Sequence, residues 1–533
     1  MKKLFYCGEV SSFHETYHLR RRAGRLSLTT VGESRKGKAT SGLLFEPKDE
    51  TRSRAVPVKV YLSKAESPCP VVLFSLSTLF WDAYLKGDSD AKSKLQSEAA
   101  RGEASLVEGD IWEWKQGKES RNRVNCAIWR LKPSSAMKLG LIAAGILITQ
   151  SVSAMDWPNW RGPNFDGKST ESIPDALPDE LPILWTTEVG TGFSSFSVAN
   201  GRVFTMGNAN DRDAVWCLDA KTGKVIWQHD YDCALDPLYY EGGPGSTPTV
   251  QGGSVFTLSK KGHAFRLDEK TGEVIWSRNL VEDHDLKLPE WSFAGSAFSD
   301  EGRVLFSAGR QGIALSRKTG KTLWLHDSDT AGYATIVPYP NQKTPQGFLY
   351  FSAKSLMSLD PSDGRILWEH SSKSSRDVNA ADPIVVDRDI VVSSSSGTER
   401  LRLVDGSAPE VVWKQHDLKW YFNPGVLIGD HLYSLHGTTH RPTELTCTDV
   451  KTGDTVWAEE GFGSGGLIAA GENIIVFDLG TLSIVPADST GFLPRLKQKI
   501  LEGKCWTAPV LSHGTVYCRN AEGKVTAVSL SID

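Results

Sequence analysis

Adjacent cysteines, Cys-x-x-Cys spacings and histidine-rich tracts are all missing from the 533 residues of this sequence. Such patterns supply most structural zinc sites, so a zinc site of this kind is not expected. A long apolar run is missing as well. The best candidate, residues 139–148, falls short of the roughly 20 residues that a membrane-spanning helix needs, and polar Thr149, Gln150 and Ser151 follow it.

Positive charge is scarce after residue 154. Residues 1–154 carry a net charge of +9, whereas residues 155–533 carry −13. Binding to nucleic acid needs a basic surface, so the acidic part is not expected to bind nucleic acid. The division also suggests that the two parts have different origins.

The boundary between the two parts has the order of a secretory signal peptide. Residues 137–154 begin with Met and Lys, continue with an apolar stretch and end in Val-Ser-Ala. Cleavage is expected near Ala154, with the mature protein periplasmic or secreted and without a membrane span. The cleavage region contains no cysteine, so a lipid anchor is not expected.

Five of the eight cysteines follow this segment, namely Cys217, Cys233, Cys447, Cys505 and Cys518. An odd number leaves at least one free thiol. Buried free thiols are favoured for all five, and the alternative disulfide is Cys505 with Cys518 on neighbouring strands.

The acidic part repeats the phrase seen in LDAKTGKVIW (218–227), LDEKTGEVIW (267–276) and TDVKTGDTVW (448–457). Its terminal tryptophan recurs at spacings of 42, 49, 48, 44, 45 and 44 residues. A period in the forties made of short strands is typical of a propeller. The recurring residues are Trp185, Trp227, Trp276, Trp324, Trp368, Trp413 and Trp457.

Each repeat divides into four strands with alternating apolar and polar residues, as in STPTV, GSVFTLS, HAFRLD and EVIW. In the Asp-x-x-Thr-Gly turn, Asp and Thr can bond nearby backbone NH groups and Gly accepts a positive φ. The tryptophans are expected to pack between blades. The last repeat lacks an outer strand, which residues 182–190 can supply. The prediction is therefore an all-β, eight-bladed propeller over residues 182–533, closed by pairing N- and C-terminal strands.

The repeated A-x-D-x-x-T-G-x-x-x-W pattern resembles the pyrroloquinoline-quinone (PQQ) repeat of quinoprotein dehydrogenases and of the Bam-complex lipoprotein. WPNWRGPNFDG, GGPGSTPTV and SFAGSAF look like exported PQQ-like propellers of planctomycete-type bacteria, often labelled polyvinyl-alcohol-dehydrogenase-like. The resemblance covers about residues 180–531 and implies the propeller fold.

Quinoprotein dehydrogenases, by this resemblance, hold PQQ over a calcium ion and often have a disulfide of adjacent cysteines. Here that disulfide is absent, the mature part is short and no ligand set aligns. No catalytic or cofactor-binding residue is therefore assigned. The favoured function is a binding or scaffold module for a protein or extracellular polymer, without catalysis. The alternative is a PQQ- and calcium-dependent alcohol or sugar dehydrogenase.

Two long connections between repeats, residues 230–245 and 279–295, are expected on one face of the propeller. They form an acidic, aromatic-edged candidate ligand face, with solvated loop charges and a packed tryptophan as the alternative. Trp420, within residues 418–425, faces the same choice. The candidates are Asp232, Glu241, Asp283, Trp291 and Trp420.

Two further segments precede the propeller. Residues 155–181 contain Trp157, Trp160 and Arg161, which are expected to cap the ring, with Arg161 pairing with an acidic loop. Within residues 1–136, the stretch 45–100 resembles the two ends of a dienelactone-hydrolase-like α/β-hydrolase. It lacks the Gly-x-Ser-x-Gly nucleophile motif. This leading part is predicted to be a disordered remnant or a mis-assigned extension, with the functional protein starting at Met137.

Overall fold

The computed structural model describes residues 156–339, 347–404, 407–437 and 443–531, and the backbone of eight strands before residue 148. Two compact units are present, residues 1–148 and 149–533. The predicted signal segment and almost all of the hydrolase-like stretch lie outside the described residues.

The strands of the first unit form one four-stranded sheet of order β3-β2-β1-β4 and two strand pairs, β5-β8 and β6-β7. They are β1 (Thr16–Arg22), β2 (Arg25–Val31), β3 (Leu43–Phe45), β4 (Pro57–Val58), β5 (Ser105–Ile111), β6 (Trp114–Lys115), β7 (Lys118–Glu119) and β8 (Val124–Arg130).

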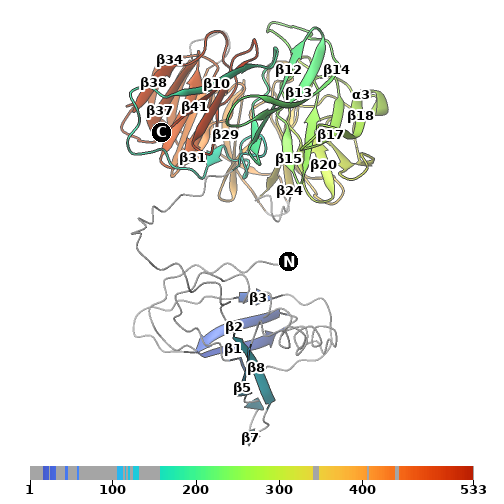
Figure 1. Ribbon diagram of the computed structural model, residues 1–533, viewed down its shortest axis with the longest axis vertical. Helices are drawn as coiled ribbons and strands as arrows, with labels where there is room; N and C mark the ends of the chain where they lie inside the picture. The colour runs from blue at the N-terminus through green and yellow to red at the C-terminus, as the bar shows by residue number, and fades with distance from the viewer. Residues whose placement is uncertain are drawn as a thin grey trace, which may run out of the picture. The chain divides into compact units, whose positions relative to one another are not determined.

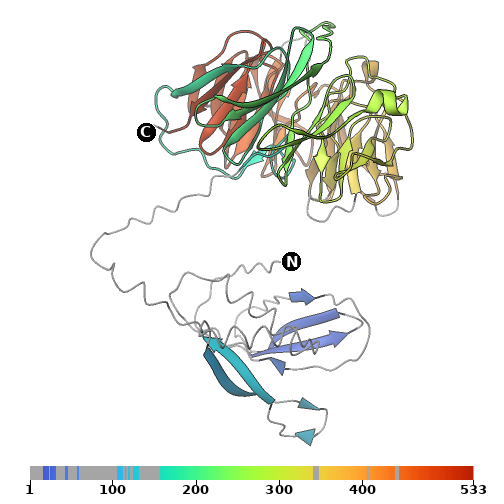
Figure 2. The ribbon, with the colours of Figure 1, turned by 45° about the vertical axis from the view of Figure 1, so that its right-hand side comes forward.

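The second unit is a β-propeller of eight four-stranded antiparallel blades (Figures 1 and 2). The first four blades along the chain comprise β11 (Ser197–Ala199), β12 (Arg202–Ala209), β13 (Arg212–Asp219) and β14 (Val225–Asp232); β15 (Thr249–Gln251), β16 (Ser254–Leu258), β17 (His263–Asp268) and β18 (Val274–Asn279); β19 (Phe298–Ser299), β20 (Arg303–Phe306), β21 (Ile313–Ser316) and β22 (Thr322–Trp324); and β23 (Val337–Tyr339), β24 (Gly347–Phe351), β25 (Ser355–Leu359) and β26 (Ile366–Ser371).

The remaining blades continue the same inner-to-outer order. They comprise β27 (Ile384–Val386), β28 (Asp389–Ser394), β29 (Gly397–Arg402) and β30 (Glu410–Gln415); β31 (Val426–Ile428), β32 (His431–His436), β33 (Thr443–Asp449) and β34 (Thr455–Phe462); β35 (Gly466–Ala470), β36 (Asn473–Asp478), β37 (Thr481–Pro486) and β38 (Leu496–Lys499); and β39 (Val510–Ser512), β40 (Thr515–Arg519) and β41 (Lys524–Ser529) with β10 (Ile183–Glu188). The short strand β9 (Lys168–Ser169) adds to β35 in parallel. The described helices are α3 (Leu280–His284) and the 3₁₀ turn η2 (Ser375–Asp377).

The ring closes as the sequence predicted. Strand β10 pairs antiparallel with β41, so that the N-terminal strand becomes the outer strand of the last blade (Figure 1). The closure removes the free edges that an open sheet would expose. The fold prediction of eight blades is confirmed.

Indole hydrogen bonds to a turn join neighbouring blades at five places in the described residues, from Trp185, Trp227, Trp276, Trp413 and Trp457. The indole Nε1 of Trp227 donates to the Glu269 carbonyl at 3.0 Å, and that of Trp276 donates to the Arg317 carbonyl at 2.9 Å. Both acceptors belong to the turn before the outer strand of the following blade. Within that type of turn, the Asp219 carboxylate accepts bonds from the backbone and hydroxyl of Thr222. The turn therefore presents a rigid surface against which the indole packs.

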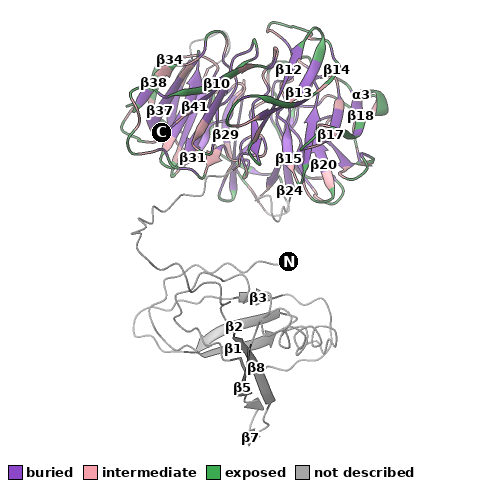
Figure 3. Ribbon diagram, viewed as in Figure 1, coloured by how far each residue is buried: buried purple, intermediate pink, exposed green. Residues whose placement is uncertain are grey.

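A register shift precedes the tryptophan in most outer strands. Cys217 pairs with Trp227 but Leu218 pairs with Val225, so Ile226 is the extra residue of a β-bulge. The bulge points the indole at the next blade and leaves Val225 and Ile226 exposed. The rim of the ring is accordingly more exposed than its inner strands (Figure 3).

The packing of tryptophan on the turn glycine gives a test with a matched control. Gly272 has a φ of +74°, and a Cβ there would lie 2.7 Å from the Trp227 ring. Gly253 has a φ of +73° and nothing within 4 Å. Gly253→Ala is expected to cost about 1–2 kcal/mol of backbone strain. Gly272→Ala is expected to cost a further ~1–2 kcal/mol for overpacking, measured by urea unfolding. Equal losses would contradict the packing role.

The five cysteines after residue 154 are as the free-thiol interpretation predicted. All five cysteines after residue 154 are buried free thiols, and Cys505 and Cys518 are not joined. Burial raises the pKa of the Cys505 thiol to about 12.

Among the described residues, no helix is long and apolar enough to cross a bilayer.

Candidate functional site

Residues 156–171, here called the plug, lie across the axis of the propeller. Trp157 exchanges backbone hydrogen bonds with Val198 of β11, at 2.8 and 2.7 Å, and the Pro158 carbonyl accepts from Val250 of β15. Farther along the plug, the Gly167 carbonyl accepts from Ala469 of β35. Because these inner strands belong to three different blades around the ring, the plug bridges across its centre.

The plug is anchored by buried side chains. Arg161 is 5% exposed and donates to the carbonyls of Pro424 and Gly425 at 3.2 and 2.9 Å. These partners are backbone groups. Arg161 was expected to pair with an acidic loop. Its hydrogen bonds go to backbone carbonyls instead of to a carboxylate. The Trp160 indole donates to Asp382 at 2.7 Å, which ties the plug to a fifth blade.

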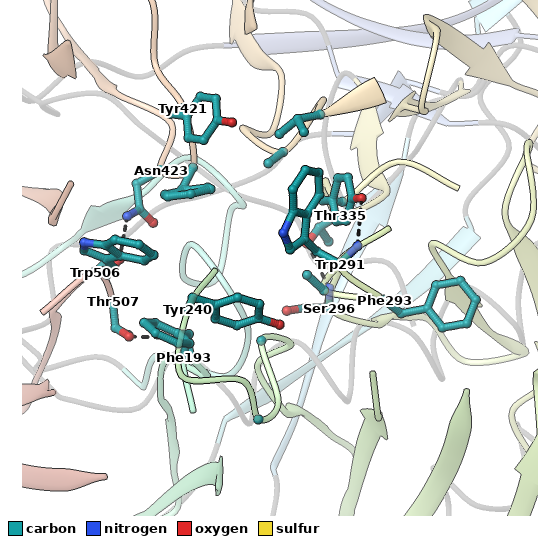
Figure 4. Close-up of a pocket in the computed structure, with 18 of the residues that line it drawn as sticks. Phe193, Tyr240, Trp291, Phe293, Ser296, Thr335, Tyr421, Asn423, Trp506 and Thr507 are labelled. Atoms are coloured by element: carbon teal, nitrogen blue, oxygen red, sulfur yellow. Dashed lines mark hydrogen bonds between the residues drawn. The ribbon is translucent and has the colours of Figure 1, made fainter. Parts of the chain in front are cut away.

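Above the plug lies a cavity of about 880 Å³, here called the cup. The connections from the outer strands to the next inner strands line it (Figure 4), all except the short β34–β35 connection. Trp160 of the plug also lines it. Its size lies in the range of small-molecule and peptide sites.

Aromatic rings form a continuous wall on one side of the cup. Phe193 lies 5.5 Å from Tyr240 and 5.6 Å from Trp506, measured between ring centroids, and Trp506 lies 5.3 Å from Phe422. Trp291 and Tyr333, with ring centroids 6.1 Å apart, form a second group of rings in the same cavity. Figure 4 shows Trp291 apart from Trp506. Burial raises the pKa of the Tyr240 and Tyr333 hydroxyls to about 12, so both rings are neutral.

A belt of hydrogen bonds runs from blade to blade beneath these rings. Just before β15, β19, β23 and β27, a side-chain oxygen accepts a hydrogen bond from the backbone NH of the equivalent residue in the preceding blade. The bonds join Ser195 to Thr247 at 3.1 Å, Thr247 to Ser296 at 2.8 Å, Ser296 to Thr335 at 3.0 Å and Thr335 to Asp382 at 2.7 Å. Three of these four acceptors are hydroxyl groups. The fourth, Asp382, is a carboxylate.

That carboxylate, Asp382, is 2% exposed and lines the cup. One oxygen accepts from the Thr335 NH and the other from the Trp160 indole. Burial raises the pKa of Asp382 to about 6, while the nearby Arg161 guanidinium, the Thr335 NH and the Trp160 indole oppose that rise. Asp382 is therefore largely ionised at neutral pH and protonated in mild acid.

Two cations at the cup are already paired. The Lys504 ammonium lies 2.8 Å from the Glu241 carboxylate and 4.3 Å from the centre of the Trp506 ring. Arg376 lies 3.6 Å from Glu290.

The predicted ligand-face residues fall in different places. Trp291 lines the cup, and Glu241 contacts it through Lys504. Asp232 and Asp283 do not line the cup; Asp232 pairs with Arg212 on β13, and Asp283 pairs with Arg278 on β18. Trp420 is fully buried in a core cluster and does not line the cup, because its chain neighbours Tyr421 and Phe422 occupy that surface.

Sequence reasoning missed several cup residues, notably Asp382, Phe193, Tyr240, Lys504 and Trp506. A signal existed for one of them. ADPIV (381–385) aligns with STPTV (246–250), so Asp382 stands where the earlier repeat has Thr247. The others lie in connections that do not repeat.

The cup was tested against the calcium-bound quinone that the quinoprotein resemblance implies. Calcium requires several oxygen ligands that converge on one point. Within the described part of residues 156–531, no three His, Cys, Asp or Glu side chains form such a group. Asp382 is the single carboxylate among the described residues that line the cup, so the cup residues do not fit a calcium-supported quinone.

The observations define an eight-bladed β-propeller whose blades are joined by tryptophan-to-turn contacts and whose axis is closed by a plug below an aromatic cup. The chain belongs to the PQQ_2 family, described as "Outer membrane protein assembly factor BamB", which matches residues 179–324 and 240–459. These matches together span more than half of the chain.

Individual relatives are distant. The chain is 26% identical to outer membrane protein assembly factor BamB of Yersinia pestis over 40% of this chain and 52% of the relative, so it spans about half of that protein's length. It is 24% identical to the Burkholderia pseudomallei (strain K96243) factor of the same name over 50% of this chain and 81% of that protein.

Solved structures share the fold. Quinohemoprotein alcohol dehydrogenase from Comamonas testosteroni has a TM-score of 0.53 at 14% identity, covering 70% of this chain and 80% of its own. A europium-containing methanol dehydrogenase has a TM-score of 0.52 at 12% identity, covering 70% and 98%. At these identities the likeness concerns fold alone.

Proposed function

We propose that this protein is an exported binding module that holds a segment of a protein partner, or of an extracellular polymer, in the cup without catalysing a reaction. The observation that carries this proposal is the cup itself: a cavity of about 880 Å³, floored by the plug and walled by aromatic rings. Aromatic side chains supply large contact areas with little loss of conformational freedom. The signal-like residues 137–154 and the family's printed role in outer-membrane assembly support a place outside the cytoplasm.

A photo-crosslinking amino acid in place of Tyr421, which lines the cup, tests this proposal in cells that produce the full chain. The expected result is a discrete cross-linked species. A matched probe at Lys451, which is 64% exposed in the turn before β34, is expected to give none. Ala380→Trp, which places a bulky ring inside the cup, is expected to abolish the adduct. Equal cross-linking from both positions, or an adduct that survives Ala380→Trp, would overturn the proposal.

The dehydrogenase alternative is tested by adding PQQ and Ca²⁺ to the purified protein and assaying dye reduction with alcohols and aldoses. No quinone-dependent dye reduction is expected, because the cup lacks converging oxygen ligands. Dye reduction that requires PQQ would replace the binding proposal with the enzymatic one.

A further inference from the structure

The hydrogen bond that Asp382 contributes to the belt does not require a charge. Its belt position is occupied by Thr247, Ser296 and Thr335 in three other blades, and their hydroxyls make the same bond to a backbone NH. A neutral hydroxyl would therefore complete the belt. A buried carboxylate instead carries a desolvation cost that the belt does not explain.

No ion pair within 4 Å offsets this charge among the described residues. The nearest cation, Arg161, directs its guanidinium at backbone carbonyls and does not line the cup. Lys504 and Arg376 line the cup, but Glu241 and Glu290 pair with them. Among the charged side chains that line the cup, Asp382 is thus the one without an ion pair within 4 Å in the described residues, although the buried Arg161 guanidinium attracts its charge.

The aromatic walls of the cup also favour a positively charged ligand. Aromatic rings carry negative charge on their faces and attract cations within about 6 Å of the ring centre. Lys504 shows this attraction within the protein, since its ammonium lies 4.3 Å from the centre of the Trp506 ring. Residues 155–533 carry a net charge of −13, which also favours approach by a basic partner.

We infer that the cup receives the cationic side chain of a lysine or arginine from the partner, with the charged group on the Asp382 carboxylate and between the aromatic rings. This inference rests on the proposed function and specifies the chemical group that the cup recognises. The test below would instead assign an apolar, anionic or sugar ligand if the cationic probes were not preferred.

The test titrates the purified full chain with N-acetyl-lysine methylamide, its arginine counterpart and the uncharged norleucine analogue, following tryptophan fluorescence at low salt. Trp160, Trp291 and Trp506 line the cup and report occupancy. The cationic probes are expected to bind at least fivefold more tightly than norleucine. Equal binding, or tighter binding of an N-acetyl-glutamate probe, would overturn the inference.

Asp382→Thr is the decisive variant, because threonine already occupies the belt position in other blades. It is expected to abolish the ratio of affinities that favours cationic probes over norleucine. Asp283→Thr, on an acidic residue outside the cup, is the matched control and is expected to keep the preference. A preference that survives Asp382→Thr would assign the recognition elsewhere.

The unmodified protein provides a second measurement if that variant fails to fold. The pKa of Asp382 is about 6, so affinity for the lysine probe is expected to fall severalfold between pH 7.5 and pH 5. The other charged groups at this site are Arg161 below and Lys504 and Arg376 with their paired glutamates at the cup. Norleucine binding is expected to be insensitive to pH, and a lysine affinity that does not fall would contradict the inference.

The two proposals fail in different ways. An adduct at position 421 without any preference for cationic probes would overturn the inference and leave the binding function standing. If neither the adduct nor the preference for cationic probes were observed, the binding function and the inference would both be overturned.

Discussion

Arg519→Met is expected to lower the free energy of unfolding of the propeller by about 3–5 kcal/mol, because it strands buried carbonyls at the point where the ring closes. Arg519 on β40 is fully buried and donates to the carbonyls of Ser194, Met206 and Gly190 at 3.0, 2.7 and 3.0 Å. Met206 belongs to the first blade, and Gly190 and Ser194 belong to the connection from β10 into that blade, whereas Arg519 belongs to the last blade. The guanidinium therefore bonds the two ends of the ring directly.

Urea unfolding followed by tryptophan fluorescence measures the loss. The matched control is Arg365→Met, since Arg365 is 66% exposed and pairs with Asp360 on the rim. Its expected cost is within about 0.5 kcal/mol, as for other surface ion pairs. If the urea midpoints of the two variants coincided, Arg519 would have no special role in closure.

Arg161→Met is expected to cost about 3–6 kcal/mol and to release the plug, because its two charge-assisted bonds to carbonyls of the propeller are each worth about 1.5–3 kcal/mol. The acceptors are Pro424 and Gly425 of the propeller and Asp166 of the plug itself. Loss of these bonds separates the plug from β31 while the blades keep their own ladders. The cup then loses its floor.

Two measurements separate this local effect from global unfolding. Limited proteolysis is expected to cut the Arg161→Met variant within residues 156–171 while the blades resist, and near-UV circular dichroism is expected to lose the contribution of fixed indoles such as Trp160. Asn164→Ala, at an exposed position of the same segment, is the control and is expected to behave like the unmodified protein. Protection of the plug in the arginine variant would show that its other contacts suffice.

The fold was predictable because its signals are local and repeated. The Asp219 turn is completed within five residues, and the tryptophan that follows it recurs at a nearly constant spacing. Strand alternation supplies the rest of each blade, and the missing outer strand of the last repeat identified β10 as its closing partner. Each of these inferences needed only short-range chemistry and counting.

The candidate site was predictable only in part, because connections without a repeat decide it. Trp291 and Trp420 are both aromatic residues in long connections, yet one lines the cup and the other lies in the core. Whether a loop residue points to the axis or to the blade depends on the neighbours it packs against, which the local sequence does not contain. Asp232 and Asp283 illustrate the same point, since nearby arginines of their own blades hold them outside the cup.

The sequence by itself determined the number of blades, the turn that locks them and the strand that closes them, since these follow from a periodic pattern acting over a few residues. Only the tertiary structure decided that residues 156–171 cross the axis and that Asp382 faces a closed cup. Both features bring together groups more than 200 residues apart, such as Trp160 and Asp382. The closure of the ring creates that proximity, because it carries the inner strands of distant repeats to a common centre.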